Sequence, residues 1–267
     1  MNLKQLVILF KKEKTMQFLL GCDPEFFLMQ NGKHVSAEAK IGGSKWKPIP
    51  IDNKGNAIQE DNVAVEFNIE PAQTFLAFKN NIHKVLNYLQ NKLEGFEFST
   101  QSAVIFDDDQ LDTAQARLFG CDPDFNAWTY TVNPRPRADN MNLRSAGGHI
   151  HIGCELAKEK PTEVIKACDL FLGVPSIILD PGTERRKLYG KAGSFRKKDY
   201  GVEYRSLSNF WIFNDNNILW VYNQVFKVLE FVANNKIIDV IDEQPIQDCI
   251  NNSDLTYYHY LTEKYNV

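Results

Sequence analysis

The sequence predicts an α+β fold in which helices pack behind an antiparallel sheet. Alternating apolar and polar residues, the pattern of strands, occur in more segments than helical patterns do. Short turn signals such as Asn31-Gly32-Lys33 separate neighbouring strand patterns, which favours antiparallel pairing. Two segments, residues 75–93 and 217–233, carry apolar side chains at helical spacing and therefore present one face for burial.

Three strands are expected in the first quarter of the chain. Residues 18–29 form an apolar stretch typical of a strand, and the turn at 31–33 leads into a partner strand over residues 34–39. A third strand is expected over residues 57–69, where apolar side chains alternate with others. Glu66 is therefore an acid within an otherwise apolar strand.

The clearest helix is expected over residues 75–93. Thr74 can cap its first turn and Gly95 can end it. Its buried face would carry Phe75, Phe78, Ile82, Val85, Leu86, Leu89 and Leu93. This spacing predicts a helix packed against the sheet along one side.

The second half of the chain continues the alternation of strands and helices. Further strands are expected over residues 103–106, 146–154 and 202–212. A helix is expected over residues 162–172, and a longer one over 217–233 follows the last strand. These elements complete the predicted α+β architecture.

Composition and charge restrict the class of protein. The chain has 267 residues, of which 43% are hydrophobic and 24% charged, so it can bury a core without a metal or disulfide staple. The net charge of −4 excludes a generally basic coat for nucleic acid, although a local basic groove stays possible. No apolar run approaches the length of a membrane-spanning helix.

Cysteine usage indicates a reducing compartment. The five cysteines are an odd, scattered set without CxxC spacing, namely Cys22, Cys121, Cys154, Cys168 and Cys249. The apolar run at residues 6–10 is too short for the core of a signal peptide and is followed by lysines. We therefore expect a cytoplasmic protein with reduced thiols.

Two units are expected along the chain. Residues 1–15 are predicted to be an N-terminal extension, either not native or disordered, with Met16 as the native start. Residues 16–267 are predicted to form a single catalytic domain, because no linker or repeat divides them. The intact mass of protein made from its own messenger RNA would show whether the chain begins at Met1 or Met16.

Acids and histidines recur on predicted strands at a spacing of two, which places both side chains of a pair on one face. A carboxylate buried in a strand costs several kcal/mol unless it is paired or bound to a metal. A sheet that lines a cavity for divalent cations explains all of these residues together, and oxygen ligands with an occasional imidazole suit Mg²⁺ or Mn²⁺. The candidate ligands are Asp23, Glu25, Glu66, His149, His151 and Glu203.

Each of these residues also has an ordinary structural interpretation. Asp23 can start a turn at Pro24, Glu66 can face water on an amphipathic strand, and Glu203 can pair with Arg205 two residues away. The metal hypothesis depends on their joint occurrence on separate strands.

A basic segment precedes the Glu203 strand. Its residues are Arg185, Arg186, Lys187, Tyr189, Gly190, Lys191, Ala192, Gly193 and Arg196. Arginine side chains and exposed backbone amides suit phosphate oxygens. The alternative is a solvated charged loop, but interleaved glycines and a tyrosine are unusual in a segment that only solubilises the chain.

Taken together, these motifs resemble the phage-type carboxylate–amine ligases of the glutamine synthetase-like superfamily, which includes glutamate–cysteine ligase. The resemblance runs from about residue 18 to residue 211. It rests on Gly21-Cys22-Asp23-Pro24-Glu25-Phe26, Val65-Glu66-Phe67-Asn68, Arg144-Ser145-Ala146-Gly147-Gly148-His149-Ile150-His151, Tyr189-Gly190-Lys191-Ala192-Gly193 and Glu203-Tyr204-Arg205-Ser206-Leu207.

The resemblance implies a curved antiparallel sheet whose concave face holds ATP with more than one Mg²⁺. It implies metal ligands at Asp23, Glu25, Glu66, Glu203 and one histidine, His149 or His151, although Asp23 stands where glutamate–cysteine ligases have Glu. Arg205, Arg185 and Arg186 would stabilise the migrating phosphoryl group, while Tyr189, Lys191 and Arg196 would contact the nucleotide. Arg144 would hold a substrate carboxylate. We expect such a ligase in the cytoplasm of a bacterial or phage-infected cell.

The implied reaction joins a carboxylate to an amine. The γ-phosphoryl group of ATP is transferred to the carboxylate, and the amine then displaces phosphate from the acyl phosphate to form an amide. The partners would be small-molecule or peptide carboxylates and amines, with no membrane and with nucleic acid as an unlikely main partner. Substrate choice would lie in the loops at residues 44–55 and 125–142, and oligomeric state stays open.

Other functions compete with this interpretation. A metal-dependent nuclease or phosphohydrolase would also use acidic clusters and basic loops, but the acidic net charge weakens it. A binding module without catalysis would have lost metal ligands, whereas the expected ligands are present here. A nucleophilic thiol at Cys22 or Cys121 is a minor alternative, because neither has an evident histidine partner in the sequence.

Overall fold

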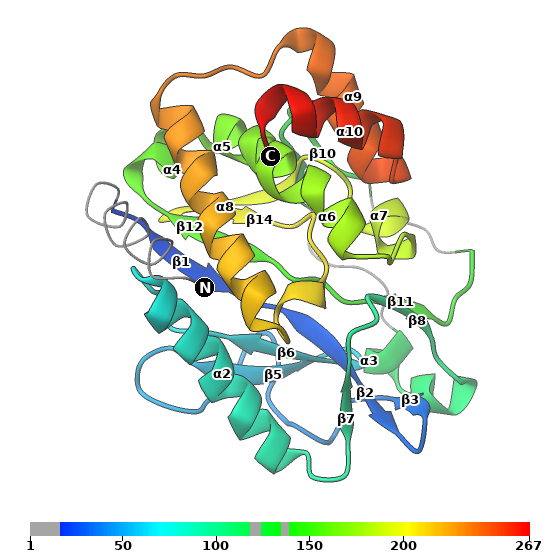
Figure 1. Ribbon diagram of the computed structural model, residues 1–267. Helices are drawn as coiled ribbons and strands as arrows, with labels where there is room; N and C mark the ends of the chain where they lie inside the picture. Colours follow the sequence, from blue (N-terminus) through cyan, green and yellow to red (C-terminus); the bar gives the residue numbers. More distant parts are fainter. Residues whose placement is uncertain (1–16, 118–123, 135–138) are drawn as a thin grey trace.

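A computed structural model describes residues 17–117, 124–134 and 139–267 (Figure 1). Residues 1–15, Met16 and Cys121 lie outside these ranges, as do residues 135–138 of the loop at 125–142 that is expected to set substrate choice. All strand pairs among the described residues are antiparallel, and helices pack against the sheets, so the predicted α+β class is confirmed.

The first sheet contains the strand that carries His151, next to its edge strand β1. Its order is β1-β12-β14-β13-β9-β10. The strands are β1 (Leu19–Cys22), β12 (Ile150–Gly153), β14 (Gly201–Tyr204), β13 (Ser194–Lys198), β9 (Phe125–Asn126) and β10 (Thr131–Val132).

The second sheet has the order β3-β2-β6-β5-β4, and a further strand, β7, pairs with β2. Its strands are β2 (Glu25–Gln30), β3 (Lys33–Val35), β4 (Ile49–Pro50), β5 (Ala57–Asp61), β6 (Ala64–Asn68) and β7 (Glu97–Ser99). A separate pair is formed by β8 (Ala103–Ile105) and β11 (Leu143–Ser145).

The single strand expected over residues 18–29 is wrong, because the chain passes from one sheet to the other within it. Strand β1 ends at Cys22 and β2 begins at Glu25, and Figure 1 shows the two strands following one another along the molecule. Pro24 has no backbone N–H for a sheet ladder, while its carbonyl accepts a hydrogen bond from Phe67 N at 3.2 Å. Asp23 therefore lies at the seam between the sheets.

Two other expected strands are also divided. Residues 57–69 form a hairpin of β5 and β6, in which Asn62 takes the left-handed conformation at φ 54° that asparagine tolerates well. The strand expected over 202–212 stops at Tyr204 and is followed by a 3₁₀ turn at Asn209–Trp211. The expected strand over 34–39 is limited to its first residues, in β3.

Two predicted helices are confirmed and cover the sheets on one side. Helix α2 spans Phe75–Lys92, and the Thr74 side chain accepts a hydrogen bond from Ala77 N as its cap. Helix α8 spans Asp215–Ala233 and packs against α2, as Figure 1 shows. Phe78 of α2 stacks on Trp211, with ring centroids 6.1 Å apart, which joins the helix to the core.

The helix expected over 162–172 is α5 (Pro161–Cys168), continued by a π-helical turn at Asp169–Gly173. The remaining helices are α3 (Ala114–Arg117), α4 (Glu155–Glu159), α6 (Val174–Leu179), α7 (Glu184–Leu188), α9 (Val240–Asn252) and α10 (Leu255–Tyr265). Helices α9 and α10 were not expected, because their apolar residues are sparse and Pro245 stands inside α9.

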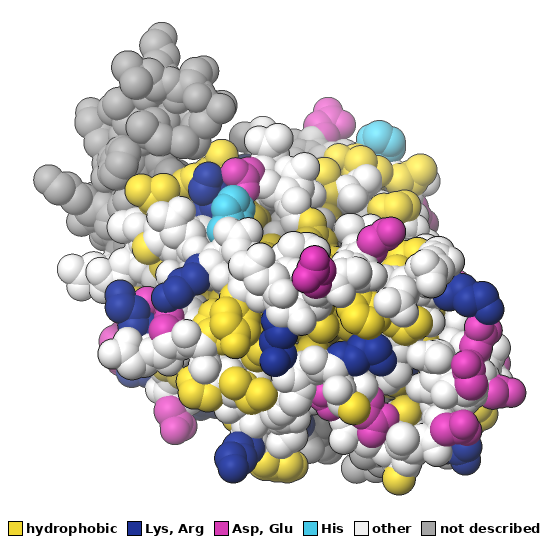
Figure 2. Space-filling model, turned by 90° about the horizontal axis from the view of Figure 1, so that it is seen from below, with side chains coloured by type: hydrophobic (Ala, Val, Ile, Leu, Met, Phe, Trp, Pro, Cys, Tyr) yellow, Lys and Arg dark blue, Asp and Glu magenta, His cyan; other side chains and the backbone are white. Residues whose placement is uncertain are grey.

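Within the described residues, no helix combines the length and the apolar character needed to cross a membrane. Cys22, Cys154, Cys168 and Cys249 are free thiols. On the face shown in Figure 2, basic and acidic side chains are interspersed rather than gathered by sign. That distribution differs from the continuous basic stripe of a general nucleic-acid binder.

Candidate metal and phosphate site

The candidate site lies at the seam between the two sheets. In the first sheet, His151 is in register with Gly21 on one neighbouring strand and with Glu203 on the other. A Cβ at Gly21 would lie 3.6 Å from the Cβ of His151, so the two residues face each other closely across the strand pair. Asp23, immediately after β1, turns towards the same position. Three strands therefore contribute to one cluster.

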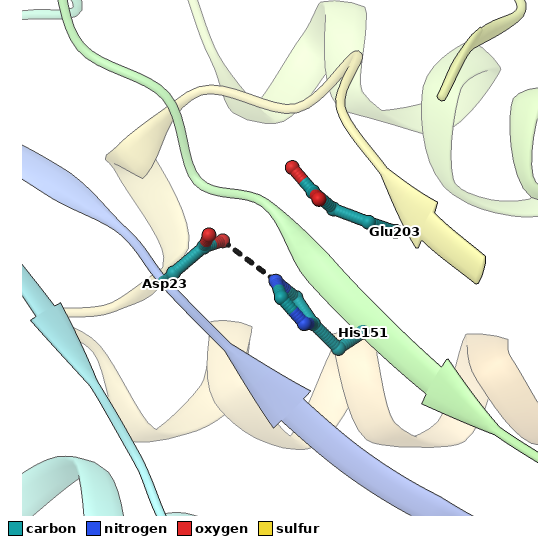
Figure 3. A group of neighbouring side chains, drawn as sticks. All are labelled: Asp23, His151 and Glu203. Carbon is teal, nitrogen blue, oxygen red and sulfur yellow. Dashed lines mark ion pairs between the residues drawn. The ribbon is translucent and has the colours of Figure 1, made fainter. Parts of the chain in front are cut away.

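The central group consists of Asp23, His151 and Glu203, each of which offers one ligand atom within 4.8 Å of the others. His151 Nε2 lies 2.9 Å from Asp23 Oδ1. Figure 3 shows these two side chains pointing toward one another, with Glu203 beside them from the next strand. Glu203 is fully buried, so two carboxylates and an imidazole share a largely enclosed position.

The second histidine, His149, precedes β12 and lies beside this group. His149 Nδ1 is 3.3 Å from Asp23 Oδ1 and 3.9 Å from Glu203 Oε1, but it is also 3.3 Å from a guanidinium nitrogen of Arg205. Burial and the Arg205 charge lower the pKa of His149 to about 4. Burial also acts against the charged form of His151, yet Asp23 reverses the effect and raises the pKa of His151. The two histidines therefore have different electrostatic environments.

A second acidic group lies in the other sheet. Glu25 of β2 is in register with Glu66 of β6, so the two carboxylates stand directly across from each other. Glu25 Oε2 accepts a hydrogen bond from Gly147 N at 2.8 Å, and Glu66 Oε2 accepts one from Gln59 at 2.6 Å. Asp61, at the end of β5, acts electrostatically on both glutamates.

Burial and mutual repulsion raise the pKa values of this second group. Burial, and then the charge of Asp61, raise the pKa of Glu25 to about 7. Burial and the neighbouring carboxylates Asp23 and Glu25 raise the pKa of Glu66 well above its ordinary value. Like charges are disfavoured when they are this close in a buried site, and a bound cation relieves the repulsion.

Three basic side chains also surround Glu203. Arg205 contacts it directly, Arg196 Nη1 lies 3.5 Å away and Lys198 Nζ lies 2.7 Å away. Burial and the Asp23 charge favour the protonated form, but Arg205 and the histidines overcome them and lower the pKa of Glu203 to about 2. Glu203 therefore links the acidic groups to three basic residues, Arg196, Lys198 and Arg205, which we call the basic edge.

The donor set fits a hard divalent cation. Asp23 Oδ1 and His151 Nε2 are buried and, among the described residues, lack a partner with hydrogen-bond alignment, although they face each other as an ion pair. Carboxylate oxygens with one imidazole match the preference of Mg²⁺ and Mn²⁺. Glu25 and Glu66, which face each other across β2 and β6, add carboxylate oxygens near this group.

Two arginines predicted for catalysis stand at the cluster. Arg205 Nε lies 3.4 Å from Asp124 Oδ2, while its other end reaches Glu203. Arg185 is buried, donates to the carbonyl oxygens of Ser206 and Arg205, and interacts electrostatically with Glu25. Both guanidinium groups are therefore held in fixed positions beside the carboxylates.

Two other predicted arginines are engaged elsewhere. Arg186 donates to the carbonyl oxygens of Ser176, Asp180 and Gly182. The Arg144 guanidinium donates to backbone carbonyls of Ala116, Met141 and Leu143. These contacts hold loops together. The structure does not bring Arg186 or Arg144 to the acidic cluster through the hydrogen bonds described.

The end of the Tyr189–Gly193 segment is hydrogen-bonded to a buried carboxylate. Asp169, in the π-helical turn, accepts hydrogen bonds from Gly193 N and from the side chains of Trp128 and Tyr204. Trp128 thus belongs to the core. Of the predicted nucleotide contacts, Arg196 lies at Glu203, while Tyr189 is partly buried and Lys191 is exposed.

Sequence reasoning missed four residues of this region. Asp61, Asp124, Lys198 and Tyr200 were not among the predicted site residues. A signal for Lys198 existed, because Arg196 and Lys198 are two residues apart and share a face of β13, in register beside the Glu203 strand. That strand was not predicted, so the signal was lost.

The comparisons agree with the chemistry of the site. Residues 137–259 match the family model described as phage phiEco32-like COOH.NH2 ligase-type 2. The matched segment includes both histidines, Glu203 and Arg205, so the predicted resemblance to phage-type carboxylate–amine ligases is confirmed there. This match supports a carboxylate–amine ligase. No curated protein matches the chain.

Two solved structures are similar over nearly the whole chain, at low identity. A glutamine synthase homolog is 11% identical with a TM-score of 0.41, and the match covers 97% of this chain and 70% of that one. A bifunctional glutathione synthetase from Pasteurella multocida is 12% identical with a TM-score of 0.41, covering 98% of this chain. This chain spans 48% of the glutathione synthetase.

Proposed function

We propose that this protein is an ATP-dependent carboxylate–amine ligase that forms an amide or peptide bond through an acyl phosphate. The observation that carries the proposal is the meeting of two acidic groups and a fixed arginine at one seam, from strands of both sheets. The family match of residues 137–259 supports the same reaction class.

In this proposal, bound Mg²⁺ ions would neutralise the phosphate oxygens of ATP and align its γ-phosphorus with the substrate carboxylate. Asp23, His151 and Glu203 would hold one ion, because their ligand atoms lie within 4.8 Å of one another. Glu25 and Glu66, with Asp61, would hold another. We assign His151 rather than His149 to the metal, since the Arg205 guanidinium beside His149 disfavours a further cation there.

The basic edge would act on the transferred group. Arg205 and Arg185 are buried and already oriented, so they can stabilise negative charge on the phosphoryl group without rearrangement. Lys191, Arg196 and Tyr189 remain the proposed contacts with the nucleotide. Arg185 also donates to backbone carbonyls, but it interacts electrostatically with Glu25. The described hydrogen bonds of Arg186 and Arg144 reach no carboxylate of the cluster, so we leave these two arginines out of this machinery.

The proposed reaction has two steps. The carboxylate oxygen attacks the γ-phosphorus, and the bond to ADP breaks. The amine then attacks the acyl carbon, and the bond to phosphate breaks as the nitrogen loses its proton. The products are ADP, phosphate and an amide.

The decisive experiment is turnover of ATP with Mg²⁺ against a panel of amino acids and peptides. Phosphate, ADP and any condensed product are detected together by mass spectrometry. We expect release of phosphate with ADP that depends on a particular substrate pair, and a product one water lighter than its parts. Glu203→Gln and Arg205→Ala should each lower turnover by about 100-fold or more.

Matched controls separate the site from general damage. Glu97→Gln and Arg117→Ala change exposed residues of the same types and should leave turnover unchanged. If no substrate pair stimulates ATP turnover while a phosphate ester or nucleic acid is cleaved in a Glu203-dependent way, the ligase is refuted. A metal-dependent phosphohydrolase would then be the function.

A further inference from the structure

Tyr200 covers the outer face of the metal cluster. It lies in the turn between β13 and β14, and its ring is stacked on the His151 imidazole, with centroids 5.9 Å apart and an interplanar angle of 19°. Its hydroxyl contacts His151 Nδ1. The other ring nitrogen, Nε2, faces Asp23 at 2.9 Å. One residue therefore contacts the side of His151 opposite the cluster.

The turn is built to bring Tyr200 to this place. Gly201 has φ 149°, and a Cβ there would overlap the carbonyl oxygen of Ile152 on the neighbouring strand. At Gly153 a Cβ would lie 3.6 Å from the Tyr200 ring. Gly201 thus lets the turn lie close against β12, which places the phenol ring over His151.

The contact of the Tyr200 hydroxyl with His151 Nδ1 affects which nitrogen of the imidazole can bind a metal. A neutral imidazole has one N–H and one lone pair, and the partner of the N–H decides which nitrogen can bind a metal. A hydroxyl that accepts a hydrogen bond from Nδ1–H leaves the lone pair on Nε2, the nitrogen that faces Asp23 and Glu203. Such outer partners of histidine ligands commonly tune metal affinity.

The two histidines differ in this respect. Nδ1 of His149 faces Asp23, Glu203 and Arg205 inside the cluster, and Gly147 lies against its other nitrogen. In the contacts described, the Tyr200 hydroxyl lies at the nitrogen of His151 that is directed away from Asp23, and His149 has no such hydroxyl partner.

We propose that Tyr200 is a positioning residue that holds His151 with Nε2 directed at the divalent cation shared with Asp23 and Glu203. The proposal rests on the metal site of the proposed function. It adds Tyr200, which contacts neither the metal nor the substrates but favours the tautomer of His151 whose lone pair is on Nε2.

The test measures Mn²⁺ binding without ATP or substrates, by calorimetry and by the electron paramagnetic resonance signal of free Mn²⁺. Tyr200→Phe keeps the stacked ring and removes only the hydroxyl, while Tyr200→Ala removes both. Tyr88→Phe, at an exposed tyrosine of α2, is the matched control. We expect Tyr200→Phe to weaken Mn²⁺ binding by about 10-fold or more, and the control to bind as the wild type does.

A second readout reports the histidine itself. In the protein saturated with Mg²⁺, long-range ¹H–¹⁵N correlation spectra assign the protonated nitrogen of the neutral His151 ring. The wild type should carry the proton on Nδ1, and Tyr200→Phe should show a mixture of both tautomers. Because Tyr200 is 42% exposed, its hydroxyl can be removed without opening the core, and thermal unfolding checks that the fold persists.

The outcomes separate this proposal from the proposed function. If the wild type binds Mn²⁺ and Tyr200→Phe matches it in affinity and tautomer, the role of Tyr200 is refuted while the metal site stands. Weakened binding with an unchanged tautomer also refutes it, because the hydroxyl would then act in another way. If the wild type binds no divalent cation, the metal site of the proposed function fails first.

Discussion

Glu25→Gln should make the metal-free protein more stable at pH 8, although it removes a proposed metal ligand. In the native state, burial and the charge of Asp61 raise the pKa of the Glu25 carboxyl from 4.5 to about 7. The folded protein therefore binds more protons than the unfolded chain between these two values. Its stability falls as the pH rises through this window, and the loss is complete above pH 7.

The magnitude follows from the shift. Each pKa unit corresponds to about 1.4 kcal/mol, so ionised Glu25 lowers the free energy of unfolding by about 3 kcal/mol at pH 8 and by about 1 kcal/mol at pH 5. A neutral glutamine has no such penalty. Its amide oxygen can still accept the hydrogen bond that Gly147 N donates to Glu25 at 2.8 Å. The gain at pH 8 should therefore exceed the gain at pH 5 by about 2 kcal/mol.

The assay is urea unfolding in the presence of a chelator, followed by circular dichroism at pH 5 and pH 8. Glu97→Gln, at an exposed glutamate, is the control and should show no pH-dependent gain. In excess Mn²⁺ the order should reverse, since the wild type gains more free energy from the bound ion. A glutamine variant that is less stable than the wild type at pH 8, or equally altered at both pH values, would refute the electrostatic reasoning.

Three further predictions concern the metal, the backbone and the rim of the site. Mn²⁺ affinity should rise between pH 5.5 and pH 8, because the ion displaces protons from Glu25 and its neighbours; calorimetry in buffers of different ionisation enthalpy should detect proton release, and its absence would contradict the assignment. Gly148→Ala should lower the free energy of unfolding by about 2 kcal/mol or more, since its Cβ would lie 2.7 Å from the carbonyl carbon of Ser208. Gly153→Ala, with ordinary contacts from 3.5 Å, is the control in the same thermal unfolding assay, and equal losses in both would contradict the prediction. Trp46 lies in the loop at residues 44–55 that is expected to set substrate choice, and its side chain is 86% exposed. Trp46→Ala should therefore change stability by less than about 0.5 kcal/mol while raising the KM of a substrate, and an unchanged KM would remove Trp46 from substrate recognition.

Local patterns were sufficient for the elements whose signals are contained in the element itself. Helix α2 begins at its predicted cap, because the Thr74 side chain satisfies a backbone amide of the first turn. Strand β6 has the predicted alternation, with Val65 and Phe67 fully buried and Glu66 turned to the site. The short-range rules fail where a strand must change partners, as at Asp23-Pro24.

The sequence by itself determined the chemical types of the site: acids and histidines on strands, followed by an arginine two residues after Glu203. A spacing of two decides which side chains share a face, and that property depends only on the chain's own backbone. The resemblance to carboxylate–amine ligases could therefore be drawn from short motifs. It was later confirmed over residues 137–259.

Only the tertiary structure decided which residues meet. The register of β12 against β14 places His151 opposite Glu203, and the pairing of β2 with β6 places Glu25 opposite Glu66. Register depends on contacts between segments far apart in the chain, and a spacing rule within one strand contains no information about them. For the same reason Asp61, Lys198 and Tyr200 could join the site only when their strands were paired.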